Sequence, residues 1–256
     1  MTNTKFRKRA LLSSVAMLLV ALVALGSATF AWFTSSSSAK AEGLAIATTK
    51  SSELKVSKAD WDWQDSVEYD DEAGTYVPTT SADGANWYTN SAATKTEFTA
   101  GAAYAPASNL SGVVYKEMFN VKNVGQQTAS GVTVTVAGTF ASTFGRIAII
   151  PVEVAENTSL STITWSKTDF SGNIYGNAAS DTWKPYNGTA LETSNYSTAA
   201  AASGKTFSLG DMAAGDVKSY VILVWFEGED ADCFDLTTSA LTIGSATALS
   251  FNVSTT

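Results

Sequence analysis

Residues 132–136 read Val-Thr-Val-Thr-Val, and this strict alternation constrains the fold more than any other feature of the chain. β-branched side chains at every position favour a strand over a helix. No stretch has a convincing amphipathic helical period. Further alternating apolar runs predict strands at residues 43–47, 53–57, 113–122, 146–154, 162–165 and 249–253. The sequence therefore predicts an all-β fold, a two-sheet antiparallel jelly-roll-like sandwich.

Three expectations concern the arrangement of these strands. Residues 113–122 and 132–136 flank a short turn, and we expect them to pair as antiparallel neighbours. Residues 217–226 end in a continuous apolar run, which is typical of a central strand covered on both faces. The apolar pattern of residues 146–154 changes phase beside Pro151, which indicates a β-bulge or an edge position.

Two long polar insertions interrupt the strand pattern, near residues 58–112 and 166–205. The first is expected to be an elaborated loop with one or two short hairpins. In the second, the alanine-rich residues 197–204 are expected to form one or two helical turns. Residues 209–216 are expected to form a turn that leads into the central strand.

The N-terminus has a basic head, and no charged residue lies between Ala10 and Ala39. A cationic start, an apolar run and small residues after it are typical of a secretory signal peptide. We therefore expect residues 1–31 to be an apolar signal helix that is removed by cleavage. Cleavage is expected between Ala31 and Trp32, with the bond after Ala28 as a second position. A retained membrane anchor is the alternative, because about 20 apolar residues cross a bilayer.

The mature chain is then expected to have a flexible N-terminal segment, residues 32–48, and a single β-sandwich domain, residues 49–256. Loss of the four basic residues of the signal leaves 12 basic against 24 acidic side chains, a net charge of −12. Such a surface repels nucleic acid, so no nucleic-acid partner is expected. Cys233 is the single cysteine, which excludes an intramolecular disulfide and predicts a buried structural thiol.

The chain contains no histidine. This absence excludes Ser-His-Asp and Cys-His catalysis and histidine-based zinc sites. There is also no phosphate-binding loop and no dinucleotide-binding glycine pattern. We therefore expect a non-enzymatic protein without a catalytic site or an obligatory cofactor.

The densest group of carboxylates follows the expected central strand. Carboxylates on one loop can surround Ca²⁺ with six to eight oxygens. A solvated acidic turn and a glycosidase-type carboxylate pair are the alternatives for this loop. The candidate metal ligands are Glu227, Glu229, Asp230, Asp232 and Asp235.

Three tryptophans of the first insertion are a second candidate site. Trp61, Trp63 and Trp87 lie among acidic and small polar residues. Aromatic rings on an exposed face could line a glycan-binding surface. Packing in the core or at its rim is the alternative.

Three stretches resemble the TasA/camelysin family, whose exported members are processed by the signal peptidase SipW. Residues 29–34, TFAWFT, are similar to the family's signal region. Residues 119–125, FNVKNVG, resemble a core strand of the family that ends in a turn. Residues 224–233, VWFEGEDADC, resemble relatives from Gram-positive anaerobes. The metalloprotease activity described for camelysin is not expected here, because the chain lacks histidine.

The resemblance implies a secreted structural subunit of an extracellular, cell-surface or biofilm-matrix fibre. Its partners would be the signal peptidase, copies of itself and related matrix subunits, and it would meet the membrane only through the signal segment. Assembly would resemble donor-strand exchange, in which an added strand satisfies an open sheet edge. The donor segment would present Trp32, Phe33, Leu44 and Ile46. A glycan-binding adhesin module and a membrane-anchored surface domain are the rival functions.

Overall fold

The computed structural model divides the chain into two units, Met1–Thr48 and Thr49–Thr256. Met17, which is helical and exposed, is the single described residue of the first unit. Apart from Met17, the expected signal peptide therefore lies outside the described part, as do both cleavage positions, the donor residues and the expected strand at residues 43–47. No helix in the described part is long and apolar enough to cross a membrane. The described residues are 17, 53–69, 74–90, 104–137, 143–176, 182–197, 199–201, 204–230, 233, 241–243 and 249–255.

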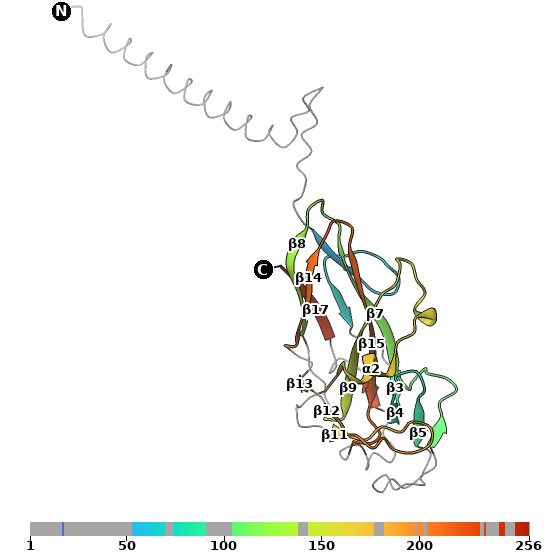
Figure 1. Cartoon of the computed structure of the whole chain (residues 1–256). Helices are drawn as coiled ribbons and strands as arrows, with labels where there is room; N and C mark the ends of the chain where they lie inside the picture. The colour runs from blue at the N-terminus through green and yellow to red at the C-terminus, as the bar shows by residue number, and fades with distance from the viewer. Residues whose placement is uncertain are drawn as a thin grey trace, which may run out of the picture. The chain divides into compact units, whose positions relative to one another are not determined.

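The second unit is built on a six-stranded sheet (Figure 1). All neighbours in this sheet are antiparallel except the last two strands, which run parallel. The strand order is β1 (Leu54–Ser57), β7 (Tyr115–Asn123), β15 (Val217–Phe226), β9 (Gly145–Val152), β10 (Ile174–Gly176) and β13 (Ala199–Ala201).

The remaining described strands form a four-stranded antiparallel sheet and three small antiparallel sheets. The four-stranded sheet has the order β14 (Thr206–Met212), β8 (Ala129–Ala137), β17 (Leu249–Ser254) and β2 (Val67–Tyr69). The small sheets join β4 (Thr79–Thr80), β5 (Tyr88–Asn90) and β6 (Tyr104–Pro106); β3 (Gly74–Tyr76) and β16 (Leu241–Ile243); and β11 (Thr182–Trp183) and β12 (Tyr196–Ser197).

Helix is scarce in the described part of this unit. It comprises the 3₁₀ turn η1 (Leu160–Thr162), the five-residue helix α2 (Lys167–Ser171) and a 3₁₀ position at Cys233. A capping box starts α2, because the Ser166 hydroxyl accepts from the Asp169 amide while the Asp169 carboxylate accepts from the Ser166 amide. The all-β prediction is confirmed.

Two apolar cores lie on the two faces of the six-stranded sheet. The first core combines residues of this sheet, such as Ile222 and Val224, with residues of the four-stranded sheet, such as Val134 and Phe251. The second core lies on the opposite face and is covered by α2, η1 and the insertions. Strand β15 contributes to both cores, so the prediction of a central strand covered on both faces is confirmed.

The predicted pairing of residues 113–122 with residues 132–136 is wrong. β7 pairs with β1 and β15, whereas β8 pairs with β14 and β17, in the other sheet. The Asn123 amide fixes this crossing by donating to the carbonyls of Gln127 at 2.7 Å and Met212 at 2.9 Å. The two strands therefore face each other across the first core. Burial of the apolar faces of β7 and β8 in this core outweighs the local tendency to form a hairpin.

The apolar pattern around Pro151 has a simpler origin than a bulge. β9 pairs with β15 without a register shift. Ile147 and Ile149 face the first core while Ala148 and Ile150 face the second, so both parities are apolar. The edge expectation is confirmed at Pro151, because β10 pairs in the described part only with Ile147 and Ala148.

Three local expectations from the second half of the chain are wrong. Residues 162–165 are not a strand, since η1 ends at Thr162 and no strand follows before α2. The described residues 197 and 199–201 of the alanine-rich segment are extended rather than helical, in β12 and β13. Residues 209–212 belong to strand β14, and only the residues after Met212 form the turn. Tertiary pairing with β11, β10 and β8 overrides the weak helix and turn propensities of these segments.

Candidate functional site

The acidic loop after β15 is buried where the structure describes it. Glu227 is 0% exposed, Glu229 7% and Asp230 8%. Asp232 and Asp235 lie outside the described residues. The alternative of a solvated acidic turn is therefore wrong for the first three carboxyl groups, which we call the buried carboxyl cluster.

Arg146 gives this cluster its counter-charge. Its guanidinium is fully buried, forms an ion pair with Asp230 and lies 4.6 Å from the centre of the Trp183 ring. It also donates to the carbonyls of Thr143 at 2.9 Å and Gly145 at 3.0 Å. A lone arginine at the head of an apolar strand was the sequence signal for a buried acidic partner.

Burial raises the pKa of two members of the cluster. The pKa of Glu227 rises to about 7, although Trp225 Nε1 donates to its carboxylate at 2.9 Å. The pKa of Glu229 rises to about 9, and its Oε1 is buried without a hydrogen-bond partner. A metal ligand must be deprotonated, so this environment opposes cation binding. Among the described residues, no group of three or more potential ligands could hold a metal ion.

The three candidate glycan-binding tryptophans do not share an exposed face. Trp61 and Trp87 are 8% and 3% exposed and belong to the second core, while Trp63 is half-buried beside Trp61. The Trp87 ring lies edge-to-face against Trp225, with centroids 5.3 Å apart. These contacts fit core and rim packing.

A groove opens where β9 ends and β15 begins, and its volume is about 580 Å³. We call it the end groove. Its apolar lining comes from Val152, Val154, Leu209 and Val217. Ser219 also lines it, is 5% exposed and has a buried Oγ without a hydrogen-bond partner.

The end groove leads towards the first core. Tyr220 lines both the groove and an apolar gap between the two sheets that is too narrow for a water molecule. Phe207 and Phe251 line the same gap. An occupant of the groove would thus extend the apolar interior of the domain.

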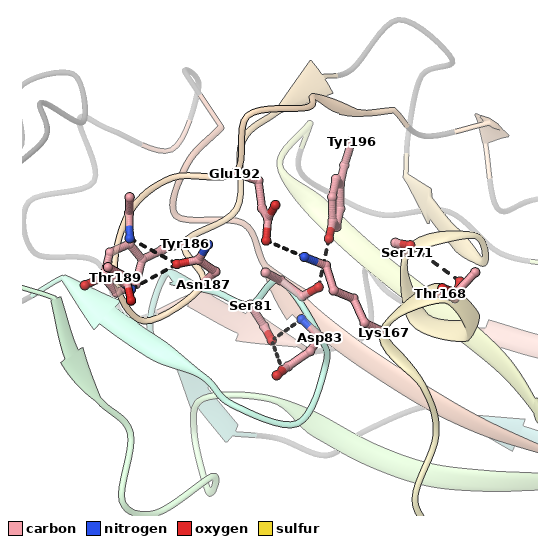
Figure 2. A network of polar contacts seen from close by, with 12 residues as sticks. Ser81, Asp83, Lys167, Thr168, Ser171, Tyr186, Asn187, Thr189, Glu192 and Tyr196 are labelled. Atoms are coloured by element: carbon pink, nitrogen blue, oxygen red, sulfur yellow. Dashed lines mark hydrogen bonds and ion pairs between the residues drawn. The ribbon is translucent and has the colours of Figure 1, made fainter.

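A second hollow, which sequence reasoning missed, has a volume of about 320 Å³ and a polar lining. We call it the polar hollow. Its signals in the sequence are the turn dipeptides Asp83-Gly84 and Asn187-Gly188, but no local pattern indicates that these two turns meet. Figure 2 shows its side chains converging from three segments. The principal lining residues are Asp83, Asn86, Tyr88, Lys167, Asn187 and Glu192.

Comparison with known proteins gives no relative for this arrangement. No protein-family model, curated protein or solved structure matches the chain.

Proposed function

We propose that this chain is a secreted structural subunit of an extracellular fibre and that it assembles by strand donation. In this proposal the domain is a jelly-roll-like sandwich, and residues 32–48, freed by cleavage before Trp32, enter the end groove of a neighbouring copy. The observation that carries the proposal is the end groove, with its mixed apolar and polar lining, beside a strand edge on which the described residues place no partner.

On the side of β9 away from β15, no described residue pairs with the strand beyond its contact with β10 and Asn173. The Ile149 amide donates to the Asn173 carbonyl at 3.0 Å, so it points away from β15. Alternate residues of a strand direct their backbone groups to the same side. Pro151 therefore directs its carbonyl to this edge, and Glu153 directs its amide and its carbonyl there. An added strand could form backbone hydrogen bonds with these groups.

The composition of the donor segment suits this groove. Leu44 and Ile46 are two residues apart, so an extended segment presents both side chains on one face. Such a face matches the lining by Leu209 and Tyr220, which both pack against the first core. Burial of two such side chains contributes roughly 3–6 kcal/mol before the cost of ordering the segment.

The groove lies at the end of the sheet where the domain begins. Leu54 pairs with Asn123, Lys122 with Val217, and Ser219 with Val152, so these residues share one end. Three strand spacings, about 15 Å, separate β1 from β9. The first described residues of the domain, which follow the donor segment in the sequence, therefore lie at the same end of the sheet as the groove.

The deciding experiment compares the chain of residues 32–256 with the chain of residues 49–256, by electron microscopy and sedimentation. The longer chain should form filaments and the shorter one should remain monomeric. Leu44→Asp with Ile46→Asp should abolish filaments, whereas the matched control Ser36→Asp with Ser38→Asp should not. Filaments of normal length from residues 49–256 would refute strand donation.

The N-terminal residue of the exported protein tests the processing step. The proposal requires Trp32 or a nearby residue at the new terminus. A product that still begins at Met1 would instead indicate a membrane-anchored surface domain.

A further inference from the structure

The polar hollow is a braced site, because contacts between side chains and backbone tie its three walls together. The walls are residues 81–88, the start of α2 and residues 187–192. The Trp165 indole donates to the Asp83 carbonyl at 3.0 Å, which joins the segment before α2 to the first wall. The Tyr196 hydroxyl donates to the Ala82 carbonyl at 2.8 Å, which joins β12 to the first wall (Figure 2).

The third brace is the ion pair of Lys167 and Glu192, which are 2.5 Å apart and connect α2 to the third wall. The lysine side chain remains 52% exposed, while that of the glutamate is 16% exposed. An ion pair of this exposure adds little stability by itself. It does hold a donor and an acceptor at the mouth of the hollow.

The polar groups of the other two walls are fixed before any ligand arrives. The Asp83 carboxylate accepts from the Ala85 amide at 2.9 Å, the Asn86 amide at 2.8 Å and the Asn86 side chain at 2.7 Å. The Asn187 side-chain oxygen accepts from the amides of Thr189 and Ala190, each at 3.0 Å. Preorganised groups of this kind lower the entropic cost of binding.

One aromatic ring gives the hollow an apolar wall. Tyr88 lies edge-to-face against Tyr186 with ring centroids 4.9 Å apart, and Tyr186 stacks on Tyr104 at 4.2 Å. Gly188 has a φ of +97°, and a Cβ at this position would lie 2.5 Å from the Tyr88 hydroxyl. The third wall can therefore approach the ring this closely only with glycine there.

The charge balance of the hollow selects the class of ligand. Asp83 and Glu192 are acidic and Lys167 is basic, and the whole chain has a net charge of −8. This balance disfavours phosphate, sulfate and other anions. The Asn86 side chain keeps its acceptor oxygen and one N–H, and Asn187 keeps its NH₂ donor because its oxygen already accepts two amides; together they offer the donors and the acceptor that neighbouring sugar hydroxyls require. A volume of about 320 Å³ lies at the small end of ligand pockets, which suits one or two sugar rings.

We propose that the polar hollow binds a neutral sugar unit of a polysaccharide, with the ring placed against Tyr88 and its hydroxyls shared among Asn86, Lys167 and Glu192. The site is independent of fibre assembly. Thr79, which precedes the first wall, bridges to Glu227 just after β15. The hollow and the end groove thus lie near opposite ends of β15, about 30 Å apart along the strand. A subunit engaged at its end groove would keep the hollow open.

The test uses the full chain in a polyoxyethylene detergent that carries no sugar. Calorimetry would measure binding of cellotriose, mannotriose and chitotriose, with a hyaluronan tetrasaccharide as the anionic comparison. At least one neutral trisaccharide should bind with a Kd on the order of 1 mM or tighter. Lys167→Ala and Asn86→Ala should each weaken that binding at least about tenfold, which corresponds to 1.4 kcal/mol. The matched control Lys122→Ala, on β7 and outside both the hollow and the groove lining, should leave it unchanged.

A second measurement guards against a variant that misfolds. In the unsubstituted chain, the side-chain amide signals of Asn86 and Asn187 should shift in NMR spectra on addition of the bound trisaccharide. Glu192→Gln, which preserves the side-chain shape, should weaken binding severalfold. No neutral binding, equal binding by the hollow variants, unshifted amides or tighter binding of hyaluronan would each overturn the proposal.

Discussion

Arg146 and its acidic partners show how a single buried charge changes the character of a loop. The guanidinium has no exposed surface, and its carbonyl, carboxylate and ring contacts replace water. Asp230 supplies the opposite charge. Glu227 and Glu229 share the same interior but have raised pKa values because burial disfavours their charged forms.

These raised pKa values predict that the domain loses stability as pH rises. Burial raises the pKa of Glu227 to about 7 and that of Glu229 to about 9, whereas the ordinary pKa of a glutamate side chain is 4.5. Between these limits the folded state binds more protons, so the free energy of unfolding falls with increasing pH. Each extra proton contributes a slope of about 1.4 kcal/mol per pH unit.

Glu229→Gln removes one titrating proton, so the free energy of unfolding should fall less steeply between pH 5 and pH 9. The slope should decrease by about 1.4 kcal/mol per pH unit. Urea denaturation at several pH values measures it. The exposed Glu153→Gln is the matched control and should leave the slope unchanged. An identical slope in Glu229→Gln would show that this carboxyl group does not titrate abnormally.

At the scale of elements, the loop between β4 and β5 packs closely against α2. Gly84 has a φ of +71°, and a Cβ there would lie 2.5 Å from the Phe170 ring. Phe170 is the buried residue of α2 and lies 6.3 Å from the Trp87 ring and 5.6 Å from the Trp225 ring, centroid to centroid. The contact between Gly84 and Phe170 therefore holds the first wall of the polar hollow against the second core.

Gly84→Ala should therefore destabilise the domain by about 2–4 kcal/mol, through backbone strain and the clash with Phe170. Gly204→Ala is the matched control, because Gly204 has a φ of +80° but no neighbouring atom within 4 Å of a new Cβ. The control should cost only about 1–2 kcal/mol. Equal losses in thermal or urea unfolding would mean that the loop does not depend on its contact with α2.

For the whole molecule, residues 49–256 form one compact unit with an apolar core on each side of its main sheet. The structure divides the chain after Thr48, and the described core residues all belong to the second unit. Cys233 is buried and is the single cysteine of the chain, so no intramolecular disulfide supports the fold. Packing on both faces of β15 is the main source of stability.

Residues 49–256 should therefore unfold cooperatively without the N-terminal segment, and reducing agent should not change the transition. If residues 32–48 complete a neighbour's groove, filaments of the longer chain should melt at a higher temperature, because the bound strand stabilises the folded state. Differential scanning calorimetry of both chains provides the comparison. A shorter chain that lacks a cooperative transition would contradict the division at Thr48.

The sequence by itself determined the all-β class, the positions of β1, β7, β8, β9, β15 and β17, and the central place of β15. These depend on local periodicity, which a strand imposes on its own side chains. It failed for β13 and β14, whose local propensities were weak or pointed elsewhere. It also failed for the candidate sites: Trp61 and Trp87 are packed inside, and the polar hollow was not anticipated.

Only the tertiary structure decided that β7 and β8 lie in different sheets, that Arg146 neutralises an acid from a loop far along the chain, and that three polar loops enclose one hollow. Each of these depends on contacts between residues distant in sequence, and no local period records such contacts. Burial of apolar faces determines which strands and sheets pack together. The polar groups then form hydrogen bonds and ion pairs with the groups that this packing brings close to them.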